Sequence, residues 1–241
     1  DLDVVRSGGM KTLFDGVYAP STIGTLLREF TFGHARQLES VLGAHLGALC
    51  ERVLLLPGAD QRAFIDIDSL LRPVYGHAKQ GASYGHTKIA GKQILRKGLS
   101  PLATTLSTTE GAPVVAGIRL RAGKSGSGKG AASMVAEAIG VARAAGAAGE
   151  ILVRGDSAYG NSFVVAACRR AGARFSLVLV KNPTITTAIA TIPEDAWIPV
   201  RYPGAVPDPE TGEWISDAQV AEIGAFTAFA STTQPVTARL I

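Results

Sequence analysis

Two aspartates that lie far apart in the sequence each come near the end of a short apolar segment. Asp68 lies in "FIDIDS" (64–69), and Asp156 directly follows "ILVRG" (151–155). Both segments have the length and composition of a β-strand. If the two strands pair in parallel, about 5 Å apart, the carboxylates meet at one edge of a sheet. Carboxylate oxygens are the ligands that Mg²⁺ or Mn²⁺ prefers, and two such ions support phosphoryl transfer.

Other residues in these segments leave alternatives open. Asp66 shares a strand face with Asp68, because both alternate with isoleucines, so Asp66 is a second candidate for the first ligand. Aspartates at strand ends also serve turns and helix caps. Tyr159 and Asn161, just after Asp156, either position a substrate or shape the turn into the next helix.

The positive charge of the chain is concentrated in its middle. Residues 72–129 hold ten Lys or Arg against one acid, Glu110, whereas the rest of the chain holds 14 bases and 19 acids. A basic segment of this kind predicts a surface for a phosphate backbone, and its alternative is an ordinary solvated face. The candidate DNA-binding residues are Lys79, Lys88, Lys92, Arg96, Lys97, Arg119, Arg121, Lys124 and Lys129.

The glycine-rich stretch "GKSGSGKG" (123–130) suggests a competing function, nucleotide hydrolysis by a phosphate-binding loop. Such a loop needs Ser or Thr directly after its lysine, but Lys129 is followed by Gly130. The preceding segment alternates Ile118 and Leu120 with arginines, which is typical of a half-exposed antiparallel strand rather than a central parallel one. We therefore interpret the stretch as a basic loop leading into a helix.

The periodicity along the chain predicts a mixed α/β fold. Helices are expected over 21–53, divided at Gly33 and capped by Ser21, and a hairpin-like excursion or loop over 72–100. The expected core elements, in order, are strands over 63–71, 102–111 and 113–123, a helix over 130–147, a strand over 150–157, a helix over 161–173 and a buried strand over 174–181. This order is that of the ribonuclease H-like fold, a mixed sheet flanked by helices.

We expect three regions. They are a helical N-terminal segment (1–58), a ribonuclease H-like core (59–182) and the start of a β-rich insertion (183–241) within which the chain is expected to be truncated.

The motifs "FIDIDS", "YGHAKQGASYGHTKIAGKQIL" and "RGDSAYGN" resemble the DDE transposases of bacterial insertion sequences, in particular the family numbered 1380. The resemblance implies an Asp-Asp-Glu triad with two Mg²⁺ or Mn²⁺ ions, which cuts transposon ends and joins them to target DNA. By position, Asp68 matches the first acid and Asp156 the second. Because the family often has Thr where this chain has Leu70, Asp66 stays the rival first ligand.

The third acid of the family lies on a helix after the β-rich insertion, so we expect it beyond Ile241. The glutamates Glu194, Glu210, Glu213 and Glu222 are interpreted as turn or surface residues. The expected partner is double-stranded DNA, with a homodimer possible in a synaptic complex. A DNA-binding remnant without catalysis is the alternative, because the triad is incomplete.

Composition is consistent with a folded protein outside the membrane. The chain is 46% hydrophobic and 18% charged, and no apolar run is long enough to span a bilayer. The N-terminus lacks the order of a secretory signal, so we expect a cytoplasmic, nucleoid-associated protein. Cys50 and Cys168 have no paired spacing and predict small core residues rather than a disulfide or zinc site.

Overall fold

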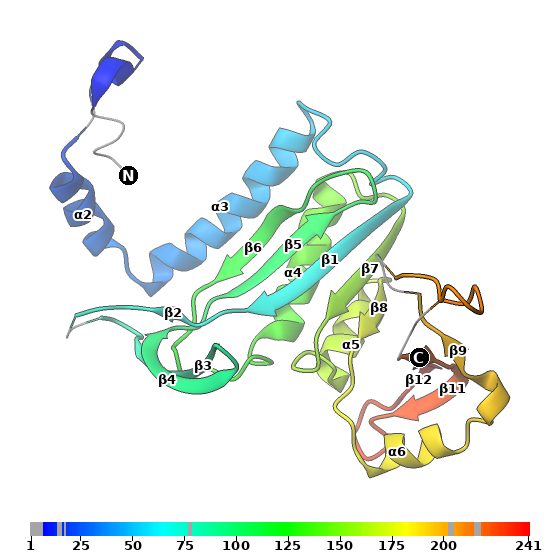
Figure 1. Ribbon diagram of the computed structural model, residues 1–241. Coiled ribbons are helices and arrows are strands. Elements are labelled where there is room, and N and C mark those ends of the chain that lie inside the picture. Colours follow the sequence, from blue (N-terminus) through cyan, green and yellow to red (C-terminus); the bar gives the residue numbers. More distant parts are fainter. Residues whose placement is uncertain (1–6, 14–15, 17, 77–78, 202–204, 215–217) are drawn as a thin grey trace.

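The computed structural model describes residues 7–13, 16, 18–76, 79–201, 205–214 and 218–241. At its centre is a five-stranded mixed sheet flanked by helices (Figure 1). Across the sheet the strands are β6 (Val114–Arg119), β5 (Leu102–Ser107), β1 (Arg62–Ser69), β7 (Glu150–Gly155) and β8 (Arg174–Leu177). The predicted mixed α/β fold is confirmed.

The pairing of the strands explains why the sheet is mixed. The β6, β5 and β1 strands pair antiparallel, as in a meander. The β7 strand pairs parallel with β1, and β8 pairs parallel with β7, because helices return the chain between these strands. These helices are α4 (Ala131–Ala144) and α5 (Ser162–Arg170).

The hydrophobic core lies between the sheet and these helices. Along β1 the residues alternate, with Ala63, Ile65 and Ile67 buried and the intervening side chains not. From α4, Met134 and Val135 fill the facing layer. Each fully buried aliphatic side chain stabilises the fold by about 1.5–3 kcal/mol relative to exposure. This alternation fixes the register of β1 and sends Phe64, Asp66 and Asp68 to the opposite face.

At the edges of the sheet the sequence interpretation needs correction. The segment 174–181, predicted as a buried strand, forms only the short strand β8, whose exposed and half-buried residues alternate because it is the sheet edge. Val178 and Val180, beyond its end, are more than half exposed. Apolar content therefore predicted the strand but not its position.

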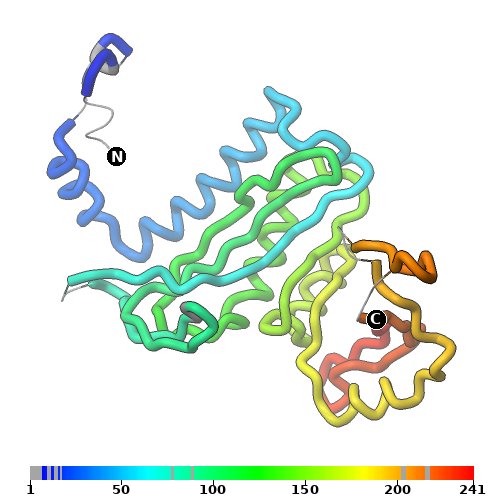
Figure 2. Tube along the Cα trace, viewed as in Figure 1, coloured from blue at the N-terminus to red at the C-terminus, as the bar shows by residue number. Residues whose placement is uncertain are grey.

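The N-terminal helices are α2 (Pro20–Glu29) and α3 (Phe32–Cys50), preceded by the 3₁₀ turn η1 (Gly8–Thr12). The predicted boundary at Gly33 is wrong by two residues, because Thr31 caps α3 through a capping box with His34. Ser21 lies inside α2, whose cap position is Ala19. The α3 helix packs on β6 and α4, whereas α2 and η1 extend away from the core (Figure 2).

The predicted excursion over 72–100 contains a β-hairpin. The β3 strand (Ser83–Ile89) and β4 (Lys92–Leu99) pair antiparallel, and the short β2 (Arg72–Pro73) adds to β4. Ala90 and Gly91 both have positive φ, as a two-residue type I′ hairpin turn requires.

The C-terminal region begins with a helix that the sequence analysis missed. The α6 helix (Pro183–Ala190) is capped by the side chain of Asn182, which accepts a hydrogen bond from the Ile185 amide at 3.0 Å. Its Thr and Ile residues favour strands, but the cap and Pro183 at the first helical position override that preference. Short elements follow: η2 (Glu194–Ala196), β9 (Ile198–Pro199), β10 (Gln219–Val220), β11 (Ile223–Ala228) and β12 (Val236–Leu240).

The two cysteines differ in burial. Cys168 is buried, and burial raises the pKa of its thiol to about 11, while Cys50 is half-buried; both thiols are free. Among the described residues, no helix is long and apolar enough to cross a membrane.

Candidate metal and DNA-binding site

The structure brings Asp68 and Asp156 to one edge of the sheet. Strands β1 and β7 run parallel, with Ile67 opposite Gly155 in the register. Asp68, the next residue of β1, and Asp156, the first residue after β7, directly follow this pair, so both lie where the two neighbouring strands end. Both are exposed. The juxtaposition expected from the sequence is therefore present.

Backbone amides orient one oxygen of each carboxylate. Oδ1 of Asp68 accepts a hydrogen bond from the Ser69 amide at 2.6 Å, and Oδ1 of Asp156 accepts one from the Ala158 amide at 2.9 Å. The second contact is an Asx turn that directs the chain into α5. Among the residues that the structure describes, Oδ2 of neither aspartate has a hydrogen-bond partner.

Asp66 lies in a different environment from Asp68. The Arg154 guanidinium donates to both oxygens of Asp66, from Nε at 2.7 Å and from a terminal nitrogen at 2.8 Å. The guanidinium also lies 4.6 Å from the ring centroid of Phe64. The Asp66 carboxylate, which raises the pKa of Arg154 chiefly through this hydrogen bond, is committed to an ion pair. This ion pair was not predicted from the sequence, although the predicted β1–β7 pairing places the two residues opposite each other.

Tyr159 lies in the core beside Gly155, the last residue of β7. Its side chain is fully buried, and burial raises the pKa of its phenol; the charges of Asp68 and Asp156 raise it further. Asn161, for which substrate positioning was considered, instead caps α5 by accepting a hydrogen bond from the Val164 amide at 3.1 Å.

The described residues do not provide a third metal ligand. Within those ranges, no group of three His, Cys, Asp or Glu side chains could hold a metal ion. Glu194, Glu210 and Glu213 are exposed, and Glu222 forms an ion pair with Arg239 at 3.4 Å.

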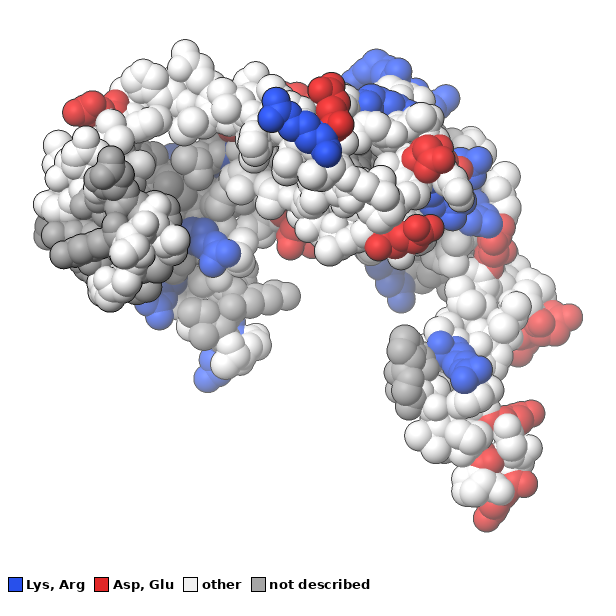
Figure 3. Space-filling view, turned by 90° about the horizontal axis from the view of Figure 1, so that it is seen from above, with Lys and Arg blue, Asp and Glu red and all other residues white. Residues whose placement is uncertain are grey.

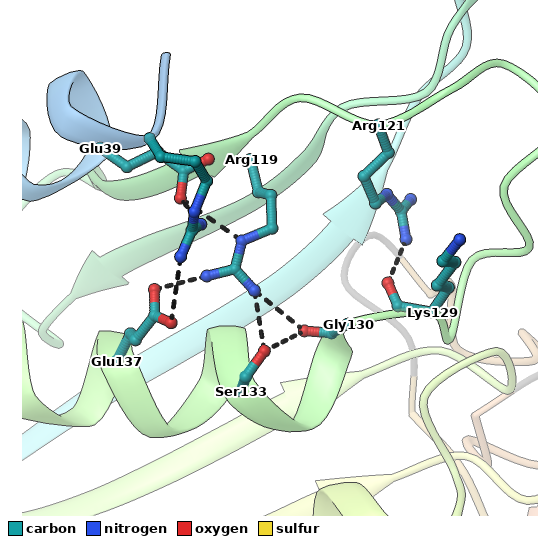
Figure 4. Close-up of polar contacts among 8 residues, drawn as sticks. Glu39, Arg119, Arg121, Lys129, Gly130, Ser133 and Glu137 are labelled. Carbon is teal, nitrogen blue, oxygen red and sulfur yellow. Dashed lines mark hydrogen bonds and ion pairs between the residues drawn. The ribbon is translucent and has the colours of Figure 1, made fainter. Parts of the chain in front are cut away.

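Two of the predicted DNA-binding arginines have their donors engaged within the protein (Figure 4). Arg119, on β6, pairs with Glu39 of α3 at 3.4 Å and with Glu137 of α4 at 2.5 Å. Its guanidinium thus ties the N-terminal helix to the core. We therefore leave Arg119 out of the proposed DNA surface.

Arg121 is buried, with 9% of its surface exposed. Its guanidinium donates to the carbonyl oxygens of Ser100, Gly126, Ser127 and Lys129, at 2.7–3.2 Å. Burial lowers the pKa of this guanidinium. Arg121 therefore organises the loop rather than presenting its charge to a ligand.

The geometry of the 123–130 loop argues against a phosphate-binding loop. Carbonyl oxygens of this loop converge on Arg121, whereas a phosphate-binding loop turns its N–H groups toward the ligand. Here the amides of Lys124, Ser125 and Lys129 donate to other protein groups. In addition, the preceding strand β6 is the antiparallel edge of the sheet.

The remaining basic candidates surround the hairpin and this loop. Lys79, Lys92, Arg96, Lys124 and Lys129 are exposed, and Lys97 is half-buried with its ammonium 3.5 Å from the Gly76 carbonyl oxygen. Lys88 lies on β3 opposite Gln93, and its side chain is outside the described set.

The hairpin and the loop pack closely. A Cβ on Gly123 would collide with the carbonyl oxygens of Ser83 and Gly98, so only glycine permits this approach. The Lys124 amide donates to the Ser83 hydroxyl at 2.9 Å. Hairpin and loop lie at the edge where β1 ends (Figure 1). In the view from above, by contrast, Lys and Arg are interspersed with Asp and Glu (Figure 3).

The sheet order, with two exposed carboxylates where parallel strands end, is compatible with a ribonuclease H-like α/β domain. Residues 19–214 match the family described as transposase DDE domain, group 1. This match spans most of the 241 residues, so the chain belongs to the DDE transposase family. A comparison with curated proteins found no match.

Proposed function

We propose that this chain carries the catalytic core of an insertion-sequence transposase of the family numbered 1380, which cleaves transposon ends and transfers the strands to target DNA. The observation that carries the proposal is the placement of Asp68 and Asp156 at the ends of adjacent parallel strands in a chain of the DDE transposase family. The basic hairpin and loop at the same edge support DNA as the substrate.

The donor set fits a divalent cation. Each aspartate holds one oxygen in a backbone hydrogen bond, and the other oxygen is without a described partner. Mg²⁺ or Mn²⁺ prefers such carboxylate oxygens. When bound, the ions would activate the attacking oxygen and stabilise the leaving oxygen of the phosphodiester. In this proposal Asp68 and Asp156 hold the ions, and a third carboxylate comes from outside the described residues.

The proposed DNA surface consists of Lys79, Lys88, Lys92, Arg96, Lys97, Lys124 and Lys129. Exposed ammonium and guanidinium groups bind phosphates without reading sequence, so this surface would hold the backbone near the carboxylates.

The test of the active site compares Asp68→Asn with Asp66→Asn in the natural full-length protein. The substrate is labelled DNA that carries the sequences flanking its gene, in Mg²⁺ or Mn²⁺. We expect Asp68→Asn to lower the cleavage rate by more than about 100-fold, because even outer partners of metal ligands contribute about 10- to 100-fold. Asp66→Asn should retain most activity, since it alters a half-exposed ion pair worth about 0–1 kcal/mol.

Three results would contradict this assignment. They are cleavage that continues with excess chelator, full activity of Asp68→Asn, and loss confined to Asp66→Asn. Binding of DNA without cleavage by the full-length protein would instead support a non-catalytic remnant.

The DNA surface is tested by the double substitution Lys124→Gln and Lys129→Gln. If each lysine contacts one phosphate, the slope of log K against log salt should fall in magnitude by about 1.8. The matched control replaces Arg52 and Arg62 with Gln. Arg62 begins β1 and Arg52 precedes it, at the opposite end of the strand from the loop, so this variant should leave the slope unchanged. Fluorescence anisotropy over a salt series measures both. If the two double variants had equal slopes of log K against log salt, Lys124 and Lys129 would not belong to the DNA surface.

A further inference from the structure

The hairpin of β3 and β4 has few contacts with the central domain. Together with β2 these strands form a sheet of their own, and they pack chiefly on one another rather than on the central sheet or its helices. An isolated two-stranded hairpin is only marginally stable in water. A partner that contacts this ribbon along its length would therefore stabilise it.

One face of the ribbon is fixed to the protein at its root. Gly85 on β3 faces the glycine-rich loop so closely that a Cβ there would collide with the Gly123 carbonyl oxygen and lie 3.2 Å from Cδ1 of Leu71. Leu71 is buried just after the end of β1. Because successive side chains of a strand point to opposite faces, Tyr84 and His86 point away from this contact. The root thus orients the ribbon relative to the end of β1.

The opposite face carries four exposed side chains without a formal charge on Tyr, Gln or Leu. Tyr84 and Leu95 are 63% and 54% exposed, and His86 and Gln93 are exposed as well. His86 lies opposite Leu95 in the register. Each has another of these residues two positions away on its own strand, so all four share one face, which we call the ribbon face. Among the described residues, its three polar side chains have no hydrogen-bond partner.

Basic side chains border the ribbon face. Lys79 precedes β3, Lys92 begins β4 beside the turn, and Arg96 lies on the other face of the ribbon opposite Gly85; all three cations are exposed. Residues 72–109 contain no acid. A second copy of the same ribbon would be repelled by these charges. They fit instead a polyanion with polar, uncharged groups between its charges, as DNA has phosphates along its backbones and base edges in its grooves.

The dimensions of the ribbon match the major groove of duplex DNA. The groove is about 12 Å wide and admits a two-stranded β-ribbon. The 7 residues of β3 span about 23 Å, the length of about seven base pairs. The side chains of the ribbon face also suit base edges. Gln pairs with N6 and N7 of adenine, an imidazole N–H donates to a purine N7, and apolar side chains contact the thymine methyl group.

We propose that the β3–β4 hairpin enters the major groove of duplex DNA at the transposon end and that the ribbon face reads base edges there. The inference rests on the proposed function, because it takes this DNA as the substrate, and it adds sequence recognition to a surface otherwise assigned only phosphate contacts. Lys92 and Arg96 bind phosphates at the rims of the groove, while the ribbon face supplies specificity. Since the hairpin begins where β1 ends, its position in the groove determines which phosphodiester lies near Asp68.

The first test removes hydrogen-bonding groups of the ribbon face. In the natural full-length protein, His86→Ala/Gln93→Ala is compared with Gln37→Ala/His45→Ala, which alters the same residue types at exposed positions of α3. Fluorescence anisotropy gives the affinities for a duplex with the sequences flanking the gene and for a scrambled duplex of equal length. The ratio of these affinities should fall about 5- to 150-fold in the ribbon variant, as for loss of one good base contact, and stay unchanged in the control. Affinity for the scrambled duplex should be kept, because phosphate contacts remain.

The second test changes the DNA instead of the protein. A flanking-sequence duplex with 7-deazapurines in place of purines lacks the N7 acceptors of the major groove and keeps its phosphates. Wild type should bind it about 5- to 150-fold more weakly than the natural duplex. His86→Ala/Gln93→Ala should bind the two duplexes nearly alike, because groups that contact each other have non-additive effects.

Each other outcome overturns the inference in a distinguishable way. An unchanged affinity ratio in the ribbon variant places sequence reading elsewhere and leaves the metal site and the phosphate contacts as proposed. Equal losses on the natural and scrambled duplexes mean that the hairpin contacts only the backbone. Full affinity of wild type for the 7-deazapurine duplex excludes the major groove, and equal affinity for the natural and scrambled duplexes excludes sequence reading. Wild type that binds neither duplex overturns the proposed function and this inference with it.

Discussion

Replacing Asp156 with Asn is expected to abolish metal-dependent DNA cleavage while leaving the protein folded. Asn keeps an oxygen that can accept the hydrogen bond from the Ala158 amide, so the turn into α5 is preserved. It loses the negative charge that a divalent cation needs. We expect the cleavage rate in Mg²⁺ or Mn²⁺ to fall by more than about 100-fold, beyond the loss caused by an outer partner of a metal ligand. The fall in cleavage rate is measured in single-turnover reactions of the full-length protein.

The variant Asp156→Ala distinguishes the effect of the carboxylate charge from the effect of the Asx turn. Alanine removes both the carboxylate and the Asx turn, so it should abolish cleavage equally and also destabilise the fold by about 1 kcal/mol, the usual contribution of a capping-type contact. Urea denaturation of both variants gives this difference. Near wild-type cleavage by Asp156→Asn would mean that Asp156 only shapes the turn. Equal destabilisation by Asn and Ala would mean that the charge itself stabilises the fold.

The positions of Asp68 and Asp156 could be predicted because two simple sequence patterns agree. Alternation of isoleucines with aspartates in 64–69 fixes which face of β1 carries Asp68. A short apolar run ending in Asp156 predicts a strand, and the intervening helical periodicity predicts a crossover, which makes the strands parallel. Both patterns can be read from short stretches of sequence, because burial of the apolar residues in the core fixes the face of β1 and the position of β7.

The environments of Asp66 and Tyr159 could not be predicted in the same way. Asp66 and Asp68 are equivalent in the sequence pattern, and only the partner opposite each one on β7 distinguishes them. Arg154 faces Asp66 in the register, whereas Asp68 lies beyond the last registered pair. The burial of the Tyr159 ring depends on its contact with Gly155 and on the end of β1. Those are tertiary features without a local signal.

The basic segment shows the limit of reasoning from charge. Ten Lys or Arg in 72–129 predict one positive surface, yet Arg119 and Arg121 are both engaged within the protein. Charge count therefore predicts the general location of the surface. Burial decides which residues belong to it.

Replacing Arg121 with Met is expected to give the largest loss of stability of any single substitution considered. The guanidinium satisfies carbonyl oxygens of Ser100 and of the loop, and each buried carbonyl left unpaired costs about 1–3 kcal/mol. Because the loop is partly exposed, water can rescue some of these oxygens, and we expect a net loss of about 2–4 kcal/mol. The measurement is the midpoint of urea denaturation at constant m-value.

Two further variants identify the cause of that loss. Lys124→Met removes a charge from the same loop, but its side chain is exposed, so its stability should stay within about 0.5 kcal/mol of wild type. Arg121→Lys keeps the charge but replaces a planar fork of five donors with three, and it should fall between wild type and Arg121→Met. If Arg121→Lys matched wild type, charge alone would stabilise the loop. If Arg121→Met matched Lys124→Met, the loop would fold without the guanidinium, and Arg121 would return to the candidates for DNA binding.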